Sequence, residues 1–128
     1  KLEVIMTNPV RLTINNEEYV LASSIKQQEA VKKDGMEYVL VRTYSAGVHI
    51  GYLKKHKGFE VVLLEAKRIH YWDGAASLSE LAQRGTSKPE NCRIPIEVSK
   101  ITLTQAIEII PMTQKAIDSI SEVPVWSC

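Results

Sequence analysis

The residues best suited to ligand chemistry lie together in one stretch of the chain, residues 68–85, which has the sequence RIHYWDGAASLSELAQRG. It begins with two cationic side chains and two aromatic rings, namely Arg68, His70, Tyr71 and Trp72. Cations beside rings suit a planar, negatively charged ligand. Aromatic side chains more often pack in a core, so a packed strand-to-helix corner is the alternative interpretation.

A short helix is predicted within this stretch, after a turn at Asp73-Gly74. Ser77 and Glu80 have the spacing of a capping box. Apolar residues follow at helical spacing, and Gly85 is a typical helix stop. The free amides of a helix N-terminus attract anions, so the sequence predicts an anion site near the preceding rings.

Further candidate ligands are guanidinium groups, which match phosphate oxygens in pairs. The four candidates are Arg42, Arg68, Arg84 and Arg93. Asn91, in the polar loop 86–91, offers both a donor and an acceptor to a base or ribose edge, or it caps its own turn. His49 shares a predicted strand face with Gly47 and Gly51, where missing side chains leave room for a ligand or for another backbone.

The elements that position these residues are predicted to form an α+β fold. It consists of an antiparallel β-sheet core, two short helices in the C-terminal half and a small N-terminal hairpin. The expected hairpin spans residues 10–21 around Asn15-Asn16, and a helix is expected from Ser23 to Asp34 with Gly35 as its stop.

Alternating apolar residues predict the strands of the main sheet. The predicted strands are Glu37–Tyr44, Val48–Leu53, Phe59–Trp72 with a bulge near Glu65-Ala66, Arg93–Val98 as an edge strand, and Ile101–Ile110. Lys54–Gly58 is predicted as a turn. Thr113 is predicted to cap a final helix. Trp126, near the chain end, is expected to dock on the core or on a partner chain.

Length and charge limit the possible classes of protein. The 128 residues suit a single domain, with 1–35 as the hairpin and helix and 36–126 as the core. Sixteen basic and fifteen acidic residues give a net charge of +1, so DNA, RNA or a membrane surface is not an expected partner. Six basic and two acidic residues between Arg42 and Arg68 nevertheless give that segment a local charge of +4, which favours a phosphate-bearing ligand.

Neither catalysis nor cofactor binding is indicated by a motif. The three histidines lie outside any triad signature, and no HExxH, CxxC or phosphate-loop pattern occurs. Cys92 and Cys128 are isolated and lack metal-ligand spacing. Their separation in the chain allows a disulfide, but a reduced, cytosolic chain is favoured. No enzyme, metal or cofactor is therefore expected, and no apolar run approaches the ~20 residues of a membrane span.

Three segments together resemble a known family. They read RTYSAGVHIGYL, RIHYWDGAASLSELAQRG and CRIPIEVSKITLTQAIEIIPMT, within residues 36–126. In this order they are similar to the phage Thoeris anti-defence signal sponges of the first type. The hairpin and helix before Met36 lie outside the resemblance.

The resemblance implies a function. Such sponges bind the cyclic ADP-ribose signal made by a TIR-domain defence protein, without cleaving it, and so keep the effector NADase inactive. It implies glycocyclic ADP-ribose as the ligand, the cytoplasm of the infected bacterium as the location, and a homodimer or larger homo-oligomer with pockets where protomers meet. Some related proteins also hold cyclic trinucleotides.

For such a ligand, the four arginines are candidates for the pyrophosphate, and Tyr71 or Trp72 for stacking on the adenine, which is worth roughly 1–3 kcal/mol. Asn91 would read the base or ribose. Two alternatives remain open: an enzyme that degrades a nucleotide signal with His49 or His70 as acid or base, and a phage structural or interaction protein.

Overall fold

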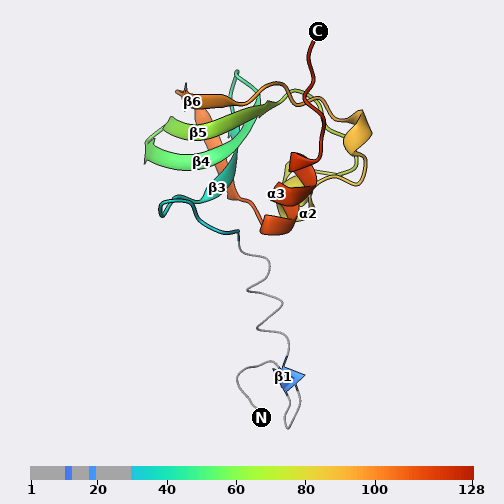
Figure 1. Cartoon of the computed structure of the whole chain (residues 1–128). Helices are drawn as coiled ribbons and strands as arrows, with labels where there is room; N and C mark the ends of the chain where they lie inside the picture. The colour runs from blue at the N-terminus through green and yellow to red at the C-terminus, as the bar shows by residue number, and fades with distance from the viewer. Residues whose placement is uncertain (1–10, 13–17, 20–29) are drawn as a thin grey trace.

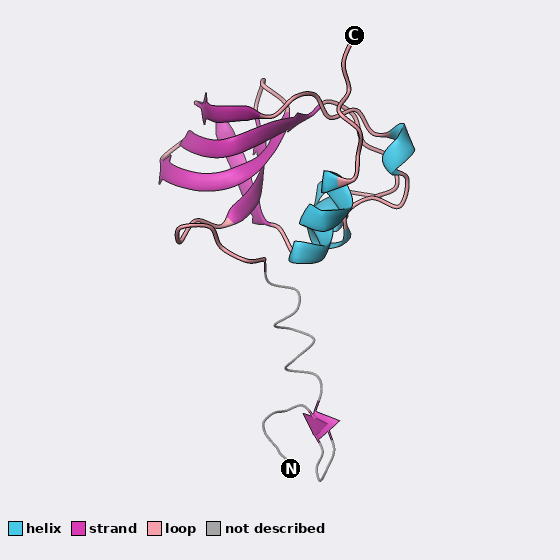
Figure 2. Cartoon of the chain, in the orientation of Figure 1, coloured by secondary structure: helices cyan, strands magenta, loops and turns pink. Residues whose placement is uncertain are grey.

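The computed structural model describes residues 11–12, 18–19 and 30–128. Its main body is a five-stranded antiparallel sheet with two short α-helices, so the predicted α+β class is confirmed (Figures 1 and 2). The strands are β3 (Tyr38–Thr43), β4 (Val48–Lys57), β5 (Glu60–Ile69), β6 (Val98–Leu103) and β7 (Ala106–Pro111). The helices are α2 (Leu78–Arg84), α3 (Gln114–Ser121) and the 3₁₀ turn η1 (Pro89–Asn91).

The sheet is strongly curled. Its strand order is β6-β5-β4-β3-β7, so β6 and β7 lie at opposite edges although only Thr104-Gln105 separates them in the chain. The two edges meet at this corner, as Figure 1 shows, because the sheet twists and coils. Backbone bonds hold the corner: the Tyr44 amide donates to the Gln105 carbonyl (2.9 Å), and the Ala106 amide donates to the Phe59 carbonyl (3.0 Å).

The single strand predicted over Ile101–Ile110 is therefore wrong. The chain leaves one edge of the sheet at Leu103 and joins the other at Ala106. Thr104-Gln105 interrupts the alternation of apolar and polar residues, but Ile107 and Ile109 return to the phase of Ile101 and Leu103, so the segment resembles one continuous strand.

Each face of the sheet has its own core, because alternate side chains of a strand point to opposite faces. The face enclosed by the curl buries Val39, Val41, Val61, Leu63, Ala66, Leu103 and Ala106. The opposite face packs against the helices and includes Leu40, Ile50, Ile69, Leu81, Ala82, Ala116 and Ile120. The predicted common face of Val48, Ile50 and Tyr52 is confirmed, since all three belong to this helix-covered core.

The bulge predicted near Glu65-Ala66 is confirmed. Pairing between β4 and β5 shifts register between Ile50 and Tyr52, and Glu65 has a left-handed φ of 50°. Gly51 lies at this point, and a Cβ there would come within 2.9 Å of the Leu64 carbonyl oxygen. The gap at Gly51 is therefore filled by the neighbouring backbone.

Helix α2 begins and ends as predicted. The Ser77 hydroxyl accepts the Glu80 amide (3.1 Å), and Gly85 ends the helix with a φ of 78°. The Glu80 carboxylate accepts a hydrogen bond from the Ala76 amide (2.8 Å), one residue before the position that a capping box predicts. A carboxylate therefore already occupies the helix N-terminus where an anionic ligand was expected.

The predicted cap of the final helix is also confirmed, and it joins the two helices. Thr113 accepts the Ala116 amide (3.0 Å) and donates its hydroxyl proton to the Gln83 carbonyl at the end of α2 (2.7 Å). The Thr113 amide donates to the Ala82 carbonyl (3.1 Å). Two of these bonds join Thr113 to α2 and the third caps α3, so one residue fixes the start of α3 against the end of α2.

The N-terminal hairpin is confirmed by an antiparallel pair, β1 (Arg11–Leu12) with β2 (Glu18–Tyr19). The helix predicted from Ser23 to Asp34 lies in part outside the described residues, and the segment 30–34 is not helical. Asp34-Gly35 instead forms a tight turn, because Lys33 and Met36 exchange backbone hydrogen bonds and both turn residues have positive φ.

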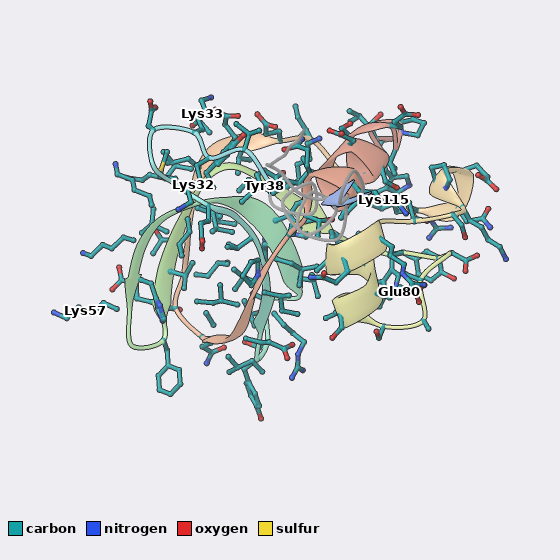
Figure 3. All side chains as sticks on the ribbon, turned by 90° about the horizontal axis from the view of Figure 1, so that it is seen from below. Lys32, Lys33, Tyr38, Lys57, Glu80 and Lys115 are labelled. Carbon is teal, nitrogen blue, oxygen red and sulfur yellow. The ribbon has the colours of Figure 1, made fainter. Side chains whose placement is uncertain are left out.

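Three further predictions need correction. Lys54–Lys57 continue β4 to its end, where Lys57 projects far from the helices (Figure 3), and the turn falls at Gly58-Phe59. The long strand predicted over Phe59–Trp72 ends at Ile69. The edge strand predicted over Arg93–Val98 is limited to two isolated bridges, at Arg93 and Ile94, before β6 begins at Val98.

Within the residues that the structure describes, no helix has the length and apolar character needed to cross a membrane.

Replacing Ser77 by alanine removes the hydroxyl that caps α2 and should lower the free energy of unfolding by about 1 kcal/mol. Ser79→Ala is the matched control, since Ser79 is exposed on the same helix, and it should change stability by less than about 0.5 kcal/mol. Urea denaturation at pH 7 measures both. Equal losses in the two variants would contradict the capping role.

Candidate functional site

The candidate site is built on a short antiparallel contact beyond the end of β5. The Arg93 amide donates to the Tyr71 carbonyl (2.8 Å), and the amides of His70 and Tyr71 both donate to the Arg93 carbonyl (2.9 and 3.2 Å). Two residues that the sequence singled out, Tyr71 and Arg93, are therefore directly paired.

The alternation of side chains across this contact separates the site from the core. Asp73 and Asn91, each two residues from the paired positions, meet on the same side as Tyr71 and Arg93. The residues between them, Trp72 and Cys92, belong to the helix-covered core. Trp72 is thus only partly exposed and packs against the core.

The C-terminal segment adds a second aromatic ring. The Trp126 amide donates to the Ile94 carbonyl (3.0 Å), next to a parallel bridge between Ile94 and Val125. The Trp126 indole stacks on the His70 ring, with centroids 4.8 Å apart and planes 13° apart.

Arg93 lies between the two exposed rings. The centre of its guanidinium is 5.8 Å from the centroid of the Tyr71 ring and 5.8 Å from that of the Trp126 ring. Both distances are within the range of cation–π attraction. Arg93 is thereby held in place without an ion pair to any other described residue.

An open pocket of about 390 Å³ lies over this contact. Three of the predicted site residues line it, namely Tyr71, Asn91 and Arg93. The other lining residues are Asp73, Glu90, Cys92 and Trp126. The pocket therefore combines two rings, one guanidinium, two carboxylates and an amide.

Asp73 is the most constrained polar group of the pocket. Its Oδ2 accepts a hydrogen bond from Asn91 Nδ2 (3.0 Å), and its Oδ1 accepts one from the Gly74 amide (2.8 Å). The bond from Asn91, followed by that from Gly74, holds the pKa of Asp73 below its ordinary value of 3.8. The carboxylate is therefore ionised at neutral pH. The Asn91 amide nitrogen is the group that bonds to this carboxylate.

The loop that carries Asn91 is packed closely on the turn that carries Asp73. Gly74 has a φ of 85°, and a Cβ there would lie 2.8 Å from the Ser87 nitrogen, so only glycine fits. The Ser87 amide donates to the Gly74 carbonyl (3.2 Å). The buried Cys92 thiol donates to the Asp73 carbonyl (3.5 Å), and both Cys92 and Cys128 are free.

The other predicted site residues lie elsewhere. Arg42 forms an ion pair with Glu108 on the neighbouring strand (3.1 Å), and Arg84 forms one with Glu80 within α2 (3.7 Å). Neither arginine lines the pocket.

Arg68 and His49 are cross-strand neighbours on β5 and β4, and both bond to the Ala46 carbonyl, at 3.0 and 2.9 Å. His49 is only 1% exposed, and burial is the main cause that lowers its pKa. His49 is thus a buried, neutral side chain that bonds to the Ala46 carbonyl of the preceding turn, and it does not line the pocket.

Two residues with the clearest contacts in the pocket were not among the predicted ligands. The sequence places Asp73 in a turn and predicts that Trp126 docks on the core or on a partner chain. One sequence feature could have indicated the position of Trp126. The apolar pair Val125-Trp126 suits pairing with the free side of the edge strand predicted at residues 93–98. Glu90 carried no signal beyond its place in a polar loop.

No cluster of three or more histidine, cysteine or acidic side chains that could hold a metal ion occurs in residues 11–12, 18–19 and 30–128.

Comparison with known proteins gives one match. A family model described as "Domain of unknown function (DUF6948)" matches residues 36–120. No curated protein and no solved structure matches the chain.

The depressed pKa of Asp73 gives a prediction for stability at low pH. The ionised carboxylate stabilises the folded state above about pH 4, and this contribution is lost as the pH falls through the folded-state pKa. The difference in unfolding free energy between the wild type and Asp73→Asn should therefore be largest near pH 7 and shrink below about pH 4. Urea denaturation across this range measures the difference.

Asn91→Ala provides the companion measurement. Without the Asn91 donor, the pKa of Asp73 should return towards its ordinary value, so the loss of stability should begin at a higher pH than in the wild type. A gap between wild type and Asp73→Asn that stays constant from neutral to acid pH would rule out this role of the carboxylate.

Proposed function

The chain belongs to the DUF6948 family, a domain of unknown function, and we propose that this member binds and sequesters a cyclic ADP-ribose signal without cleaving it. It would act as a phage anti-defence protein in the infected bacterium and keep the Thoeris effector inactive. The proposal rests on the resemblance of three segments to the signal sponges of the first type, and on the chemistry of the pocket.

The observation that carries the proposal is the Arg93 guanidinium, 5.8 Å from the centroids of both the Tyr71 and Trp126 rings. Aromatic rings offer stacking surfaces to a base, worth roughly 1–3 kcal/mol each. A guanidinium offers donors to phosphate or to ring nitrogens. The amide and carboxylates beside them add polar partners, so the pocket has the mixed character that a nucleotide needs.

A sponge has no turnover and must bind tightly, because it removes its ligand in a fixed ratio. A nanomolar Kd corresponds to about −12 kcal/mol, which is more than one stack and one charged contact supply. Tyr71 and Trp126 remain 52% and 42% exposed, so apolar ring area is left to be covered. A homodimer that encloses the ligand between two chains would supply the missing contacts.

A specific observation also favours the interaction-protein alternative. Tyr44 and Phe59 are 78% and 69% exposed and flank the corner at Thr104-Gln105. Exposed aromatic side chains are common in protein interfaces. The alternative of an enzyme that degrades the signal with His49 or His70 as acid or base has less support. His49 is buried, and one face of the His70 ring is covered by Trp126.

The test of the proposal follows the fate of the signal. The protein is incubated with the product of a TIR-domain enzyme, passed through a size filter and heated, and the released material is assayed for activation of the effector NADase. Intact active signal released on heating would support sequestration. Loss of the signal with nothing active released would indicate an enzyme. Free passage of the signal through the filter would reject both functions and favour the interaction-protein alternative.

Arg93→Gln should weaken binding of the signal at least tenfold, because charge-assisted hydrogen bonds contribute about 1.5–3 kcal/mol each. Arg84→Gln is the matched control, since Arg84 is exposed on α2 and does not line the pocket. Isothermal titration calorimetry compares the two variants. Wild-type affinity in Arg93→Gln, with the fold intact by circular dichroism, would remove Arg93 from the site.

A further inference from the structure

We infer that the pocket takes the nucleoside portion of its ligand, with ribose hydroxyls on Asp73 and the base against Trp126, and leaves the phosphates outside. This inference rests on the proposed function and specifies how the same site would read its ligand. It assigns the carboxylates a role in recognition and changes the role expected of the arginines.

The charges of the pocket argue against a phosphate in its interior. The lining residues carry one positive charge, on Arg93, and two negative charges, on Asp73 and Glu90. Hydrogen bonds from Asn91 and Gly74 to Asp73 favour its ionised form. A pyrophosphate placed between the two carboxylates would meet like charges, whereas hydroxyl groups would meet acceptors.

The size of the pocket leads to the same conclusion. Its volume of about 390 Å³ is near the lower end of the roughly 300–1,000 Å³ that small-molecule sites occupy. A cyclic ADP-ribose contains two phosphates, two riboses and an adenine. A pocket of this size suits one nucleoside unit, so part of the ligand would remain outside.

Asp73 is prepared to accept hydroxyl groups. Each of its carboxylate oxygens accepts one hydrogen bond from the protein, from Gly74 on Oδ1 and from Asn91 on Oδ2. An ionised carboxylate has about four acceptor positions, so each oxygen keeps one for a ligand. Because the two protein donors fix the plane of the carboxylate, a ribose hydroxyl can be accepted on either oxygen without further ordering. An acidic side chain binds ribose hydroxyls in this manner in dinucleotide-binding folds.

The base has partners on the remaining sides. One face of the Trp126 indole is covered by His70, while the residue lines the pocket and is 42% exposed. Asn91 uses its amide nitrogen on Asp73, which leaves its carbonyl oxygen as an acceptor. An exocyclic amino group such as that of adenine would supply the matching donor. Arg93, at the rings, can then reach a phosphate at the rim.

The experiment uses the full-length protein and nuclear magnetic resonance, which detects weak binding of ligand fragments. Adenosine, 2′,3′-dideoxyadenosine and inorganic pyrophosphate are each titrated, and the indole N–H signal of Trp126 and the side-chain amide signal of Asn91 are followed. We expect adenosine to shift both signals, dideoxyadenosine to bind about tenfold more weakly, and pyrophosphate to leave both signals unchanged. Trp126→Phe identifies which of the two indole signals belongs to Trp126.

Asp73→Asn should weaken adenosine binding about tenfold and remove the preference over dideoxyadenosine. Asp118→Asn, on the exposed side of α3, is the matched control and should behave as the wild type. The comparison of the two nucleosides on the wild-type protein keeps the inference testable even if the Asp73 variant fails to fold.

Two outcomes would overturn the inference. One is pyrophosphate shifting the Trp126 and Asn91 signals while adenosine does not. The other is equal affinity of adenosine and dideoxyadenosine for the wild type. In either case the filter experiment with intact signal still decides the proposed function separately. Conversely, adenosine binding with free passage of the signal would support a nucleoside pocket and reject the sponge.

Discussion

The antiparallel contact between Tyr71 and Arg93 is the constraint on which the candidate site depends. Three backbone hydrogen bonds hold it, and its register determines what lies on each side. Asp73 and Asn91 meet because each is two positions beyond the paired residues, while Trp72 and Cys92 turn into the core. Ile94, the next residue after Arg93, receives the Trp126 segment. One short pairing therefore brings together residues from three distant parts of the chain.

Several structural features that depend on neighbouring residues were predicted correctly, whereas features that depend on pairing with distant residues were not. The caps at Ser77 and Thr113 and the stop at Gly85 follow from nearby residues alone, and all three were predicted correctly. The corner at Thr104-Gln105 is not predicted because the apolar residues after it, Ile107 and Ile109, return to the phase of Ile101 and Leu103, as they would in one continuous strand. At the site, side-chain chemistry alone indicates Tyr71, Asn91 and Arg93, which line the pocket. Asp73 and Trp126 were missed because their roles depend on the register of a contact that no local pattern specifies.

The four arginines show why chemistry alone does not identify a ligand-binding residue. All four candidates carry the same guanidinium, and the sequence favours Arg68, which stands beside the rings in the chain but does not line the pocket. The exposed ion pairs of Arg42 and Arg84 are worth little energetically and would not by themselves prevent phosphate binding. Their position on other elements distinguishes them from Arg93, which lies between two rings at the pocket.

The pocket divides naturally into a fixed part and an uncovered part. Asp73 and Asn91 hold each other, so a ligand that binds them costs little ordering entropy. Tyr71 and Trp126 remain about half exposed on the same chain, so much of their ring surface would stay in contact with water beside a ligand. Differences in affinity between related complexes arise mainly from dissociation rates. A sequestering protein built on this pocket would therefore depend on whatever covers the two rings once the ligand is bound, and a second copy of the chain would provide that cover symmetrically.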